Sequence, residues 1–395
     1  MEVYLDNSAT TKITEKVRDR VMKVLYEDYG NPSSMHRLGI NAEAYMKEAA
    51  MNLAGCLKVD PKELVFTSGG TESNNLALIG TAMAYKRRGK HIITSRIEHP
   101  SVHQPLLYLE ENGFEISFAP VDETGKIIEE KLYELIREDT ILVSVMYVNN
   151  EIGSVQEVRE LATGLKNRKK DIIFHVDAVQ AFGKYRIYPK REGIDLLTIS
   201  GHKIHGPKGS GALYISDKVR VNPVVFGGGH QRGLRSGTEN VPAIAGLGQA
   251  VAELYENHEE KRARMYGLKQ KFLRELSKLE GVSFNGLPKE CSSTFEMELL
   301  KTTAPHIISV SFEGVRSEVF LHALEDRGVY VSAGSACSSH HPQPSVTLTA
   351  IKLPKDLMDS TLRISLSDLT TEEEVDYALE QFRDLLPFLR RYQRK

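Results

Sequence analysis

Two residues with reactive or charged side chains follow apolar runs of the sequence, where strands of a sheet would present them to a ligand. Lys203 comes shortly after the apolar residues 194–199, and small residues and histidines surround it. Burial lowers the pKa of a lysine, and a neutral amine condenses with an aldehyde to form a Schiff base. Asp177 ends a second, largely apolar run, residues 172–176. Because ligands of open α/β sheets gather at the carboxyl ends of strands, we expect both side chains at one site.

The pairing of these two residues indicates a particular cofactor. Taken singly, a lysine after a strand is usually solvated, and an aspartate at a strand end is usually a helix cap. Together they supply what pyridoxal phosphate requires, a lysine for a Schiff base and an acid that holds the pyridine nitrogen. Lys203 and Asp177 therefore predict a pyridoxal-phosphate enzyme.

The composition is that of an ordinary globular protein with room for two domains. The chain has 395 residues, 41% hydrophobic and 26% charged, and its formal net charge of −2 gives no sign of affinity for nucleic acid or a membrane. No apolar run approaches the roughly 18 residues of a membrane span, and the first residues show no export signal. The three cysteines are scattered and odd in number, which argues against a disulfide framework and predicts a cytoplasmic location.

The first two thirds of the chain alternate short apolar runs with amphipathic stretches, the pattern of an α/β fold with a mainly parallel sheet and flanking helices. We place this large, cofactor-binding domain at residues 15–258, and a smaller α+β domain, which carries the loop of Cys337, at residues 1–14 and 259–395. Seven strands are expected in the large domain, at residues 63–67, 91–95, 115–120, 141–148, 172–176, 195–199 and 211–215.

The last third of the chain predicts different elements. Residues 242–280 read as one long helical run, and residues 339–345, with two prolines and no periodicity, read as a loop. The smaller domain is expected to contain strands at residues 307–312, 329–332 and 362–366 and helices at residues 317–326 and 371–389.

Two glycine-rich segments are candidates for binding an anion. Residues 67–73, Thr-Ser-Gly-Gly-Thr-Glu-Ser, link a predicted strand to a predicted helix. Glycines let backbone N–H groups approach a phosphate, and a helix N-terminus favours negative charge. Residues 226–238 hold three consecutive glycines and two arginines, which suits either a surface loop or a segment that folds over an anion or across a subunit boundary.

Three polar residues at strand ends or within a strand are further candidates. His99 follows the strand predicted at residues 91–95, where its ring can stack on a planar cofactor and move protons, although a helix cap is the commoner role. The amide of Asn150 can bind a phenolic oxygen or a carboxylate, or it can form a turn. Arg363 interrupts an apolar strand, so it requires either a substrate carboxylate or an internal salt bridge.

Cys337 is the candidate nucleophile among the cysteines. It lies in a run of small and polar residues, whereas Cys56 lies among apolar ones and reads as a core residue. A zinc site built from Cys337, His340 and His341 is disfavoured because no fourth ligand has a suitable spacing, and we expect no metal.

The chain resembles the cysteine desulfurases of the NifS/IscS type, within the class V aminotransferase group of fold-type I pyridoxal-phosphate transferases. The resemblance covers nearly the whole chain, from Tyr-Leu-Asp-Asn-Ser-Ala-Thr-Thr at residues 4–11 and Gly-Asn-Pro-Ser-Ser at 30–34 to Thr-Thr-Glu-Glu-Glu at 370–374. It implies conversion of L-cysteine to L-alanine, with the sulfur passing to Cys337 as a persulfide and then to an acceptor.

The resemblance also implies roles for the matching residues. Lys203 would hold the cofactor as a Schiff base and, once freed, remove the α-proton, while His99 stacks on the ring and acts with Lys203 and Cys337 in catalysis. Asp177 would pair with the pyridine nitrogen, and Gln180 would contact the phenolic oxygen. The positions that match phosphate ligands are Gly70, Thr71, Ser200, His202 and, reaching the neighbouring subunit of a homodimer, Thr238.

Asn150 and Arg363 match the ligands of the substrate carboxylate, and the Ser-Ala-Cys-Ser setting of Cys337 is similar to that of the long-loop group I branch. The sulfur acceptor is left open between an iron–sulfur scaffold and a tRNA-thiolating enzyme, because the chain stops soon after its last predicted helix. Direct binding of nucleic acid is not expected.

Three other functions compete with this one. A selenocysteine lyase or a class V aminotransferase would use the same cofactor without needing Cys337. A dinucleotide-binding oxidoreductase is excluded because no Gly-x-Gly-x-x-Gly follows the first strand. A binding protein without activity is disfavoured by the presence of Lys203, Asp177 and Cys337 together.

Overall fold

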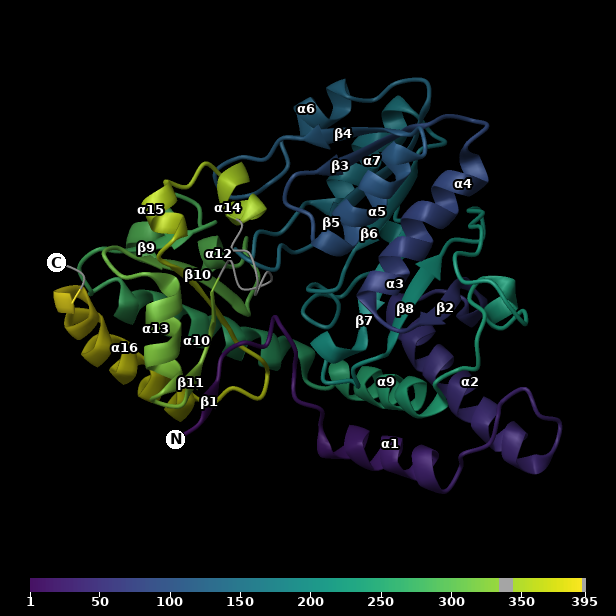
Figure 1. Cartoon of the computed structure of the whole chain (residues 1–395), viewed down its shortest axis with the longest axis horizontal. Helices are drawn as coiled ribbons and strands as arrows, with labels where there is room; N and C mark the ends of the chain where they lie inside the picture. The colour runs from purple at the N-terminus through teal and green to yellow at the C-terminus, as the bar shows by residue number, and fades with distance from the viewer. Residues whose placement is uncertain (334–343, 393–395) are drawn as a thin grey trace.

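The computed structural model describes residues 1–333 and 344–392, and its largest element is a seven-stranded sheet (Figure 1). The strand order is β2-β8-β7-β6-β5-β3-β4. Only β8 is antiparallel to its neighbours in this sheet, so the predicted mainly parallel α/β sheet is confirmed. The strands are β2 (Leu64–Thr67), β3 (His91–Ser95), β4 (Glu115–Ala119), β5 (Thr140–Met146), β6 (Ile173–Asp177), β7 (Leu196–Ser200) and β8 (Gly211–Ile215).

Both faces of the inner strands of this sheet are buried, which explains why these strands are mainly apolar. Side chains alternate between the faces, so Val143 of β5 packs in one hydrophobic cluster and the adjacent Leu142 in another. The cluster of Val143 includes residues of α2 (Arg37–Leu57), α7 (Val158–Arg168) and α9 (Val241–Leu254). The cluster of Leu142 includes residues of α4 (Thr81–Tyr85) and α5 (Pro100–Glu111). A central strand of this kind is covered by helices on both sides.

Shorter helices complete this part of the chain. From Gly70 the helical path continues through a π-helical turn, Leu76–Gly80, into α4 without an intervening loop. The remaining helices here are α1 (Glu15–Tyr26), α3 (Gly70–Asn75), α6 (Glu129–Glu134) and α8 (Pro189–Glu192).

The helical run predicted at residues 242–280 is two helices and not one. The first, α9, ends at Leu254, and the second, α10, spans His258–Leu276. Between them Asn257 adopts the left-handed conformation, with φ of 52°. Asparagine tolerates this conformation better than most residues, and it redirects the chain at that point.

The smaller sheet is antiparallel, with the order β12-β13-β10-β9. The strand predicted at residues 329–332 is divided, because β11 pairs with β1 and β12 pairs with β13. Strand β9 was not predicted. The strands outside the large sheet are β1 (Val3–Tyr4), β9 (Val282–Asn285), β10 (Ile307–Phe312), β11 (Val329–Tyr330), β12 (Ser332–Ala333) and β13 (Thr361–Ser365). The helices around them are α11 (Cys291–Thr294), α12 (Met297–Leu300), α13 (Ser317–Glu325), α14 (Val346–Ala350), α15 (Lys355–Met358) and α16 (Glu372–Tyr392).

The N-terminal segment connects the two sheets. Figure 1 shows it leaving β1, beside the small sheet, and running to α1 beneath the helices of the large sheet. On the way, Thr11 donates from its backbone N–H to the carbonyl of His202, at 2.8 Å, and His205 donates from its backbone N–H to the Thr11 hydroxyl, at 2.7 Å. Among residues 1–333 and 344–392, no helix is long and apolar enough to cross a membrane.

Candidate active site

A cavity of about 470 Å³ opens where the carboxyl ends of β5, β6 and β7 face the small sheet. This volume falls in the range of small-molecule sites, ~300–1,000 Å³. Most of the residues predicted from the sequence line it: Gly70, Thr71, His99, Asn150, Asp177, Gln180, Ser200, His202, Lys203 and Arg363.

Asp177, the last residue of β6, is buried at the floor of the cavity, with 4% of its surface exposed. Its Oδ2 accepts a hydrogen bond from Asn74 Nδ2 at 2.8 Å, and its Oδ1 accepts one from the backbone N–H of Val179 at 2.9 Å. These donors fix the carboxylate in place and stabilise its charge in the interior. A buried acid of this kind can hold a cationic ring nitrogen.

Lys203 ends a short 3-10 helix directly after β7, and its amine meets the N-terminal segment. The Nζ donates to the carbonyl of Ala9 at 2.8 Å and also to the carbonyl of Ser8. These two backbone carbonyls orient the amine. The lysine thereby remains at the wall of the cavity with an amine that a ligand can approach.

His99 caps the N-terminus of α5 with its own side chain. Its Nδ1 accepts from the backbone N–H of Ser101 at 3.1 Å. Burial lowers the pKa of His99, the positive charge of Lys203 lowers it further, and Asp177 opposes the shift. The imidazole is therefore neutral near pH 7, with the proton on Nε2 because Nδ1 is an acceptor. A neutral ring can stack on a planar ligand.

The glycine pair before α3 forms the wall where a phosphate is expected. Gly69 has φ of 151°, a conformation that favours glycine, and a Cβ built on Gly70 would lie 2.7 Å from Val179 Cγ2. A larger residue would be strained at Gly69, and at Gly70 it would require Val179 to shift. Beside them, Glu72 accepts from Arg235 Nε at 2.7 Å, so this arginine of the glycine-rich segment already has an anionic partner within its own chain.

Ser200 and His202 close the same side of the cavity from the end of β7. Burial lowers the pKa of His202 to about 4, and the neighbouring Lys203 and Lys208 contribute. Its Nδ1 lies 3.2 Å from the hydroxyl of Thr10. At neutral pH His202 is therefore an uncharged hydrogen-bonding group.

Arg363 has an internal ion-pair partner, the alternative that the sequence left open. Its Nη2 donates to Asp6 Oδ1 at 2.7 Å, and its Nη1 donates to the carbonyl of Asn150 at 3.0 Å. Its Nε is buried and has no partner within the described part of the chain. Arg363 lines the cavity, and its contacts with Asp6 and Asn150 fix the orientation of the guanidinium there.

The last predicted residues to place are Gln180, Thr238 and Cys337. Gln180 is buried beside the cavity, where its Nε2 donates to the carbonyl of Ser8 at 3.0 Å. Thr238 is exposed and does not line this cavity, and its assignment to the phosphate of a neighbouring subunit stays a prediction. Cys337, with His340 and His341, lies outside the described residues, and those that are described contain no cluster of potential metal ligands.

The sequence reasoning missed the contribution of the N-terminal segment. Asp6, Ser8 and Ala9 all line the cavity, and two of their carbonyl groups hold Lys203. The sequence analysis used residues 4–11 as part of the family resemblance. It assigned none of them a role at the site. His306, which contacts Gln180 from the small sheet, carried no signal in the sequence.

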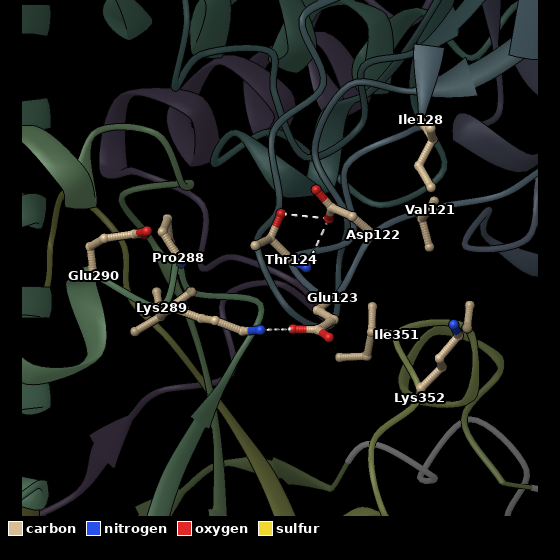
Figure 2. Close-up of a pocket in the computed structure, with 12 residues that line it drawn as sticks. Val121, Asp122, Glu123, Thr124, Ile128, Pro288, Lys289, Glu290, Ile351 and Lys352 are labelled. Atoms are coloured by element: carbon tan, nitrogen blue, oxygen red, sulfur yellow. Dashed lines mark hydrogen bonds and ion pairs between the residues drawn. The ribbon is translucent and has the colours of Figure 1, made fainter. Parts of the chain in front are cut away.

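A second hollow, of about 460 Å³, lies between the turn at residues 121–128 and the segments at residues 287–290 and 350–352 (Figure 2). Figure 2 shows the ion pair of Lys289 and Glu123, 2.8 Å apart, across it. Both side chains are largely exposed, so this pair is weak. None of the residues predicted to do chemistry lies there, and the cavity of Lys203 is the candidate active site.

The chain belongs to the class V aminotransferase family, whose model matches residues 3–378. The membership inferred from the motifs is thereby confirmed.

Individual relatives and solved structures resemble the chain over most of its length. The cysteine desulfurase IscS of Methanosarcina thermophila is 40% identical over 388 residues, which cover 98% of this chain and 93% of the relative. A solved structure described as a NifS-like protein superposes with a TM-score of 0.91 at 37% identity, covering 98% of this chain and all of the other. A structure described as SspA in complex with cysteine has a TM-score of 0.77 at 32% identity, covering 93% and 100% of the two chains.

Proposed function

We propose that the protein is a pyridoxal-phosphate-dependent cysteine desulfurase. The observation that carries the proposal is the convergence of Lys203, Asp177 and His99 on one cavity, in a chain whose relatives named as cysteine desulfurases match it over nearly their full length. The same cavity contains Arg363, a cation suited to an amino-acid carboxylate.

The residues of the cavity fit pyridoxal phosphate chemically. Asp177 offers a buried acid for the pyridine nitrogen, and Lys203 offers a primary amine for the aldehyde. The phosphate would be held by Gly70, Thr71, Ser200 and His202, at a wall that a Cβ on Gly70 would fill. When bound, the cofactor supplies an electron sink for charge that develops at the α-carbon of the substrate.

The protein's own groups then handle protons and orientation. Lys203 Nζ removes the α-proton, since the carbonyls of Ser8 and Ala9 hold that amine at the cavity. His99, which is neutral, would stack on the ring of the cofactor, where it would exclude water from one face and relay a proton through Nε2. Arg363 and Asn150 bind the carboxylate of L-cysteine, while Asp6 fixes the guanidinium from behind.

Cys337 receives the sulfur. Its thiolate attacks the sulfur of the substrate, a new S–S bond forms, and the C–S bond breaks. The bonding electron pair stays with the substrate carbon, which is protonated to give alanine, and the protein is left as a persulfide. The sulfur is then passed to an acceptor protein, either an iron–sulfur scaffold or a tRNA-thiolating enzyme.

The enzyme acts as a homodimer in this proposal. Large apolar side chains are exposed on α1, on the segment that joins it to α2, at the start of α2 and on the glycine-rich segment. A monomer rarely exposes so many. They are Met22, Leu25, Tyr26, Tyr29, Met35, Ile40 and Phe226. In such a dimer, as the resemblance implies, Thr238 of each subunit would reach the phosphate bound by the other.

The chain divides into the two domains given above, with boundaries near residues 14 and 258. In support, Val3 and Leu5 pack in the same hydrophobic cluster as residues of α10, α13 and α16. Cys56 and Cys291 are free thiols, and sulfur transfer through a thiol requires a reducing compartment, so we place the enzyme in the cytoplasm.

The test compares wild-type holoenzyme with Cys337→Ser. A serine oxygen cannot carry a persulfide, so alanine and sulfide formation from L-cysteine should fall to background. The ultraviolet–visible spectrum should still change on addition of cysteine, because substrate binding needs Lys203 and Arg363 but not Cys337. Turnover of cysteine at the wild-type rate would instead favour a selenocysteine lyase or an aminotransferase.

A further inference from the structure

His306 is a buried histidine that approaches the active site from the small sheet. It directly precedes β10, and 2% of its surface is exposed. Its Nε2 lies 3.3 Å from Oε1 of Gln180, which follows β6 of the large sheet. The contact therefore joins the two sheets through a residue assigned to the cofactor.

The hydrogen-bond partners fix the orientation of the Gln180 amide. The carbonyl of Ser8 can only accept, so the group 3.0 Å away from it must be the Gln180 nitrogen. The amide oxygen then faces His306, and an oxygen can only accept, so His306 Nε2 must carry a hydrogen and donate. One of the two N–H groups of Gln180 is used by Ser8, and the other is available to the cavity that Gln180 lines.

The surroundings of His306 hold it in the required form. Burial places the pKa of His306 well below its ordinary value, and the positive charges of Lys184, Lys269, Arg363 and Lys203 lower it further. The ring is neutral, so it carries one proton. Its Nδ1 is buried without a partner in the described part of the chain, which leaves Nε2 as the protonated atom.

We propose that His306 is a positioning residue, which donates from Nε2 to Gln180 Oε1 and so keeps an N–H of Gln180 directed at the phenolic oxygen of the cofactor. This inference rests on the proposed function, and in particular on the role assigned to Gln180. Without His306 the amide loses the partner of its oxygen and is held through Ser8 alone. The second N–H of Gln180 is then directed less firmly at the phenolic oxygen, and that hydrogen bond weakens.

The experiment measures the pH at which the visible absorption band of the bound cofactor changes in the holoenzyme. A donor at the phenolic oxygen withdraws negative charge, which otherwise stabilises the protonated nitrogen beside it. Loss of the donor should therefore raise this pH midpoint. One hydrogen bond is worth about a factor of ten, so we expect His306→Leu to raise the midpoint by about one pH unit.

Three further variants make the result specific. His306→Gln places an amide N–H at about the reach of Nε2 and should restore the wild-type midpoint. Gln180→Leu removes the donor itself, and combining it with His306→Leu should add nothing, since both act through one interaction. The control is His91→Leu, because His91 is equally buried and hydrogen-bonded to Thr140 and Ser117, but at the opposite end of the large sheet.

The outcomes separate this inference from the function on which it rests. A shift with Gln180→Leu but none with His306→Leu would overturn the role of His306 and leave that of Gln180 intact. No shift with either variant would overturn both roles. A shift of equal size with His91→Leu would also overturn the proposal, because it would show a general effect of losing a buried histidine.

A measurement on the wild-type protein reports the protonation of His306 directly. In the nitrogen-15 spectrum of histidine-labelled holoenzyme, His306, assigned by its absence in His306→Gln, should show the neutral form with hydrogen on Nε2 from pH 6 to 8. A hydrogen on Nδ1, or an imidazolium at pH 7, would contradict the proposed donor.

Discussion

At the scale of single residues, the site depends on side chains whose hydrogen-bond partners lie far away along the sequence. Arg363 is oriented by Asp6, and Lys203 is held by the carbonyls of Ser8 and Ala9. Each of these contacts leaves a functional atom directed at the cavity, because the partner occupies only part of the group's hydrogen-bonding capacity. The chemistry of the site therefore depends on the hydrogen-bonding atoms that contacts within the chain leave unoccupied.

The first prediction concerns the carboxylate of the substrate. Arg363→Lys replaces a planar fork with a point charge, which cannot contact Asp6 and a carboxylate together. We expect KM for L-cysteine to rise roughly tenfold, the worth of one charge-assisted hydrogen bond, with a smaller change in kcat. The control is Arg137→Lys, an exposed arginine paired with Glu115, and steady-state kinetics on both variants decide the matter. An unaltered KM in Arg363→Lys would assign this residue to the ion pair with Asp6 alone.

The second prediction concerns Glu98, which precedes His99 and is fully buried. Burial raises the pKa of Glu98 to about 8. Between pH 5 and 8 the folded state therefore retains a proton that the unfolded state releases, so the free energy of unfolding falls as pH rises, by up to about 1.4 kcal/mol per pH unit. Glu98→Gln cannot titrate and should lack this fall. Urea denaturation of both proteins at pH 5.5 and pH 8 measures it, and parallel pH dependences would contradict the assignment.

At the scale of elements, the third prediction concerns the glycine pair before α3. The Cβ of Gly70→Ala would lie 2.7 Å from Val179 Cγ2, so the wall must shift. We expect at least a severalfold loss of affinity for pyridoxal phosphate, measured by fluorescence titration of the apoprotein, and recovery on combination with Val179→Ala. Gly267→Ala in α10 meets no atom within 4 Å and should leave the affinity unchanged. Equal affinity in Gly70→Ala and wild type would place the phosphate elsewhere.

The large sheet was predictable because each strand is a short apolar run bounded by polar turns. Its predicted and observed bounds differ by at most two residues, as in β5, expected at residues 141–148 and found at Thr140–Met146. The break at Asn257 was not predictable, because an asparagine within an otherwise helical pattern gives no sign of a left-handed conformation. The division of β11 from β12 depends on two different pairing partners, β1 and β13, which only the folded chain brings together.

In the active site too, the features with a local sequence pattern were predictable and the long-range contacts were not. Lys203, Asp177 and His99 were predictable because each follows a strand of one sheet, and the ends of parallel strands meet at one edge. The contacts of Ser8 and His306 were not, because they connect residues more than a hundred positions apart without any local pattern.

At the scale of the whole molecule, the fourth prediction concerns the dimer. Replacing Leu25 and Tyr26 of α1 with glutamate puts charge on the exposed apolar face, and we expect sedimentation to show monomers. Phe388→Glu alters an exposed apolar residue of α16, which packs with the small sheet, and should leave the dimer intact. A dimer that survives the double substitution would place the subunit contact on another face.

The most direct measurement of the central claim is the mass of the protein after a single turnover with L-cysteine. The account predicts that the peptide containing Cys337 gains one sulfur atom, that a reductant removes it, and that Cys337→Ser shows no gain. Cys56→Ser, which removes a partly buried thiol of the core, should gain sulfur like the wild type. Alanine formed at the wild-type rate with no added sulfur on Cys337 would contradict the persulfide mechanism and with it the proposed function.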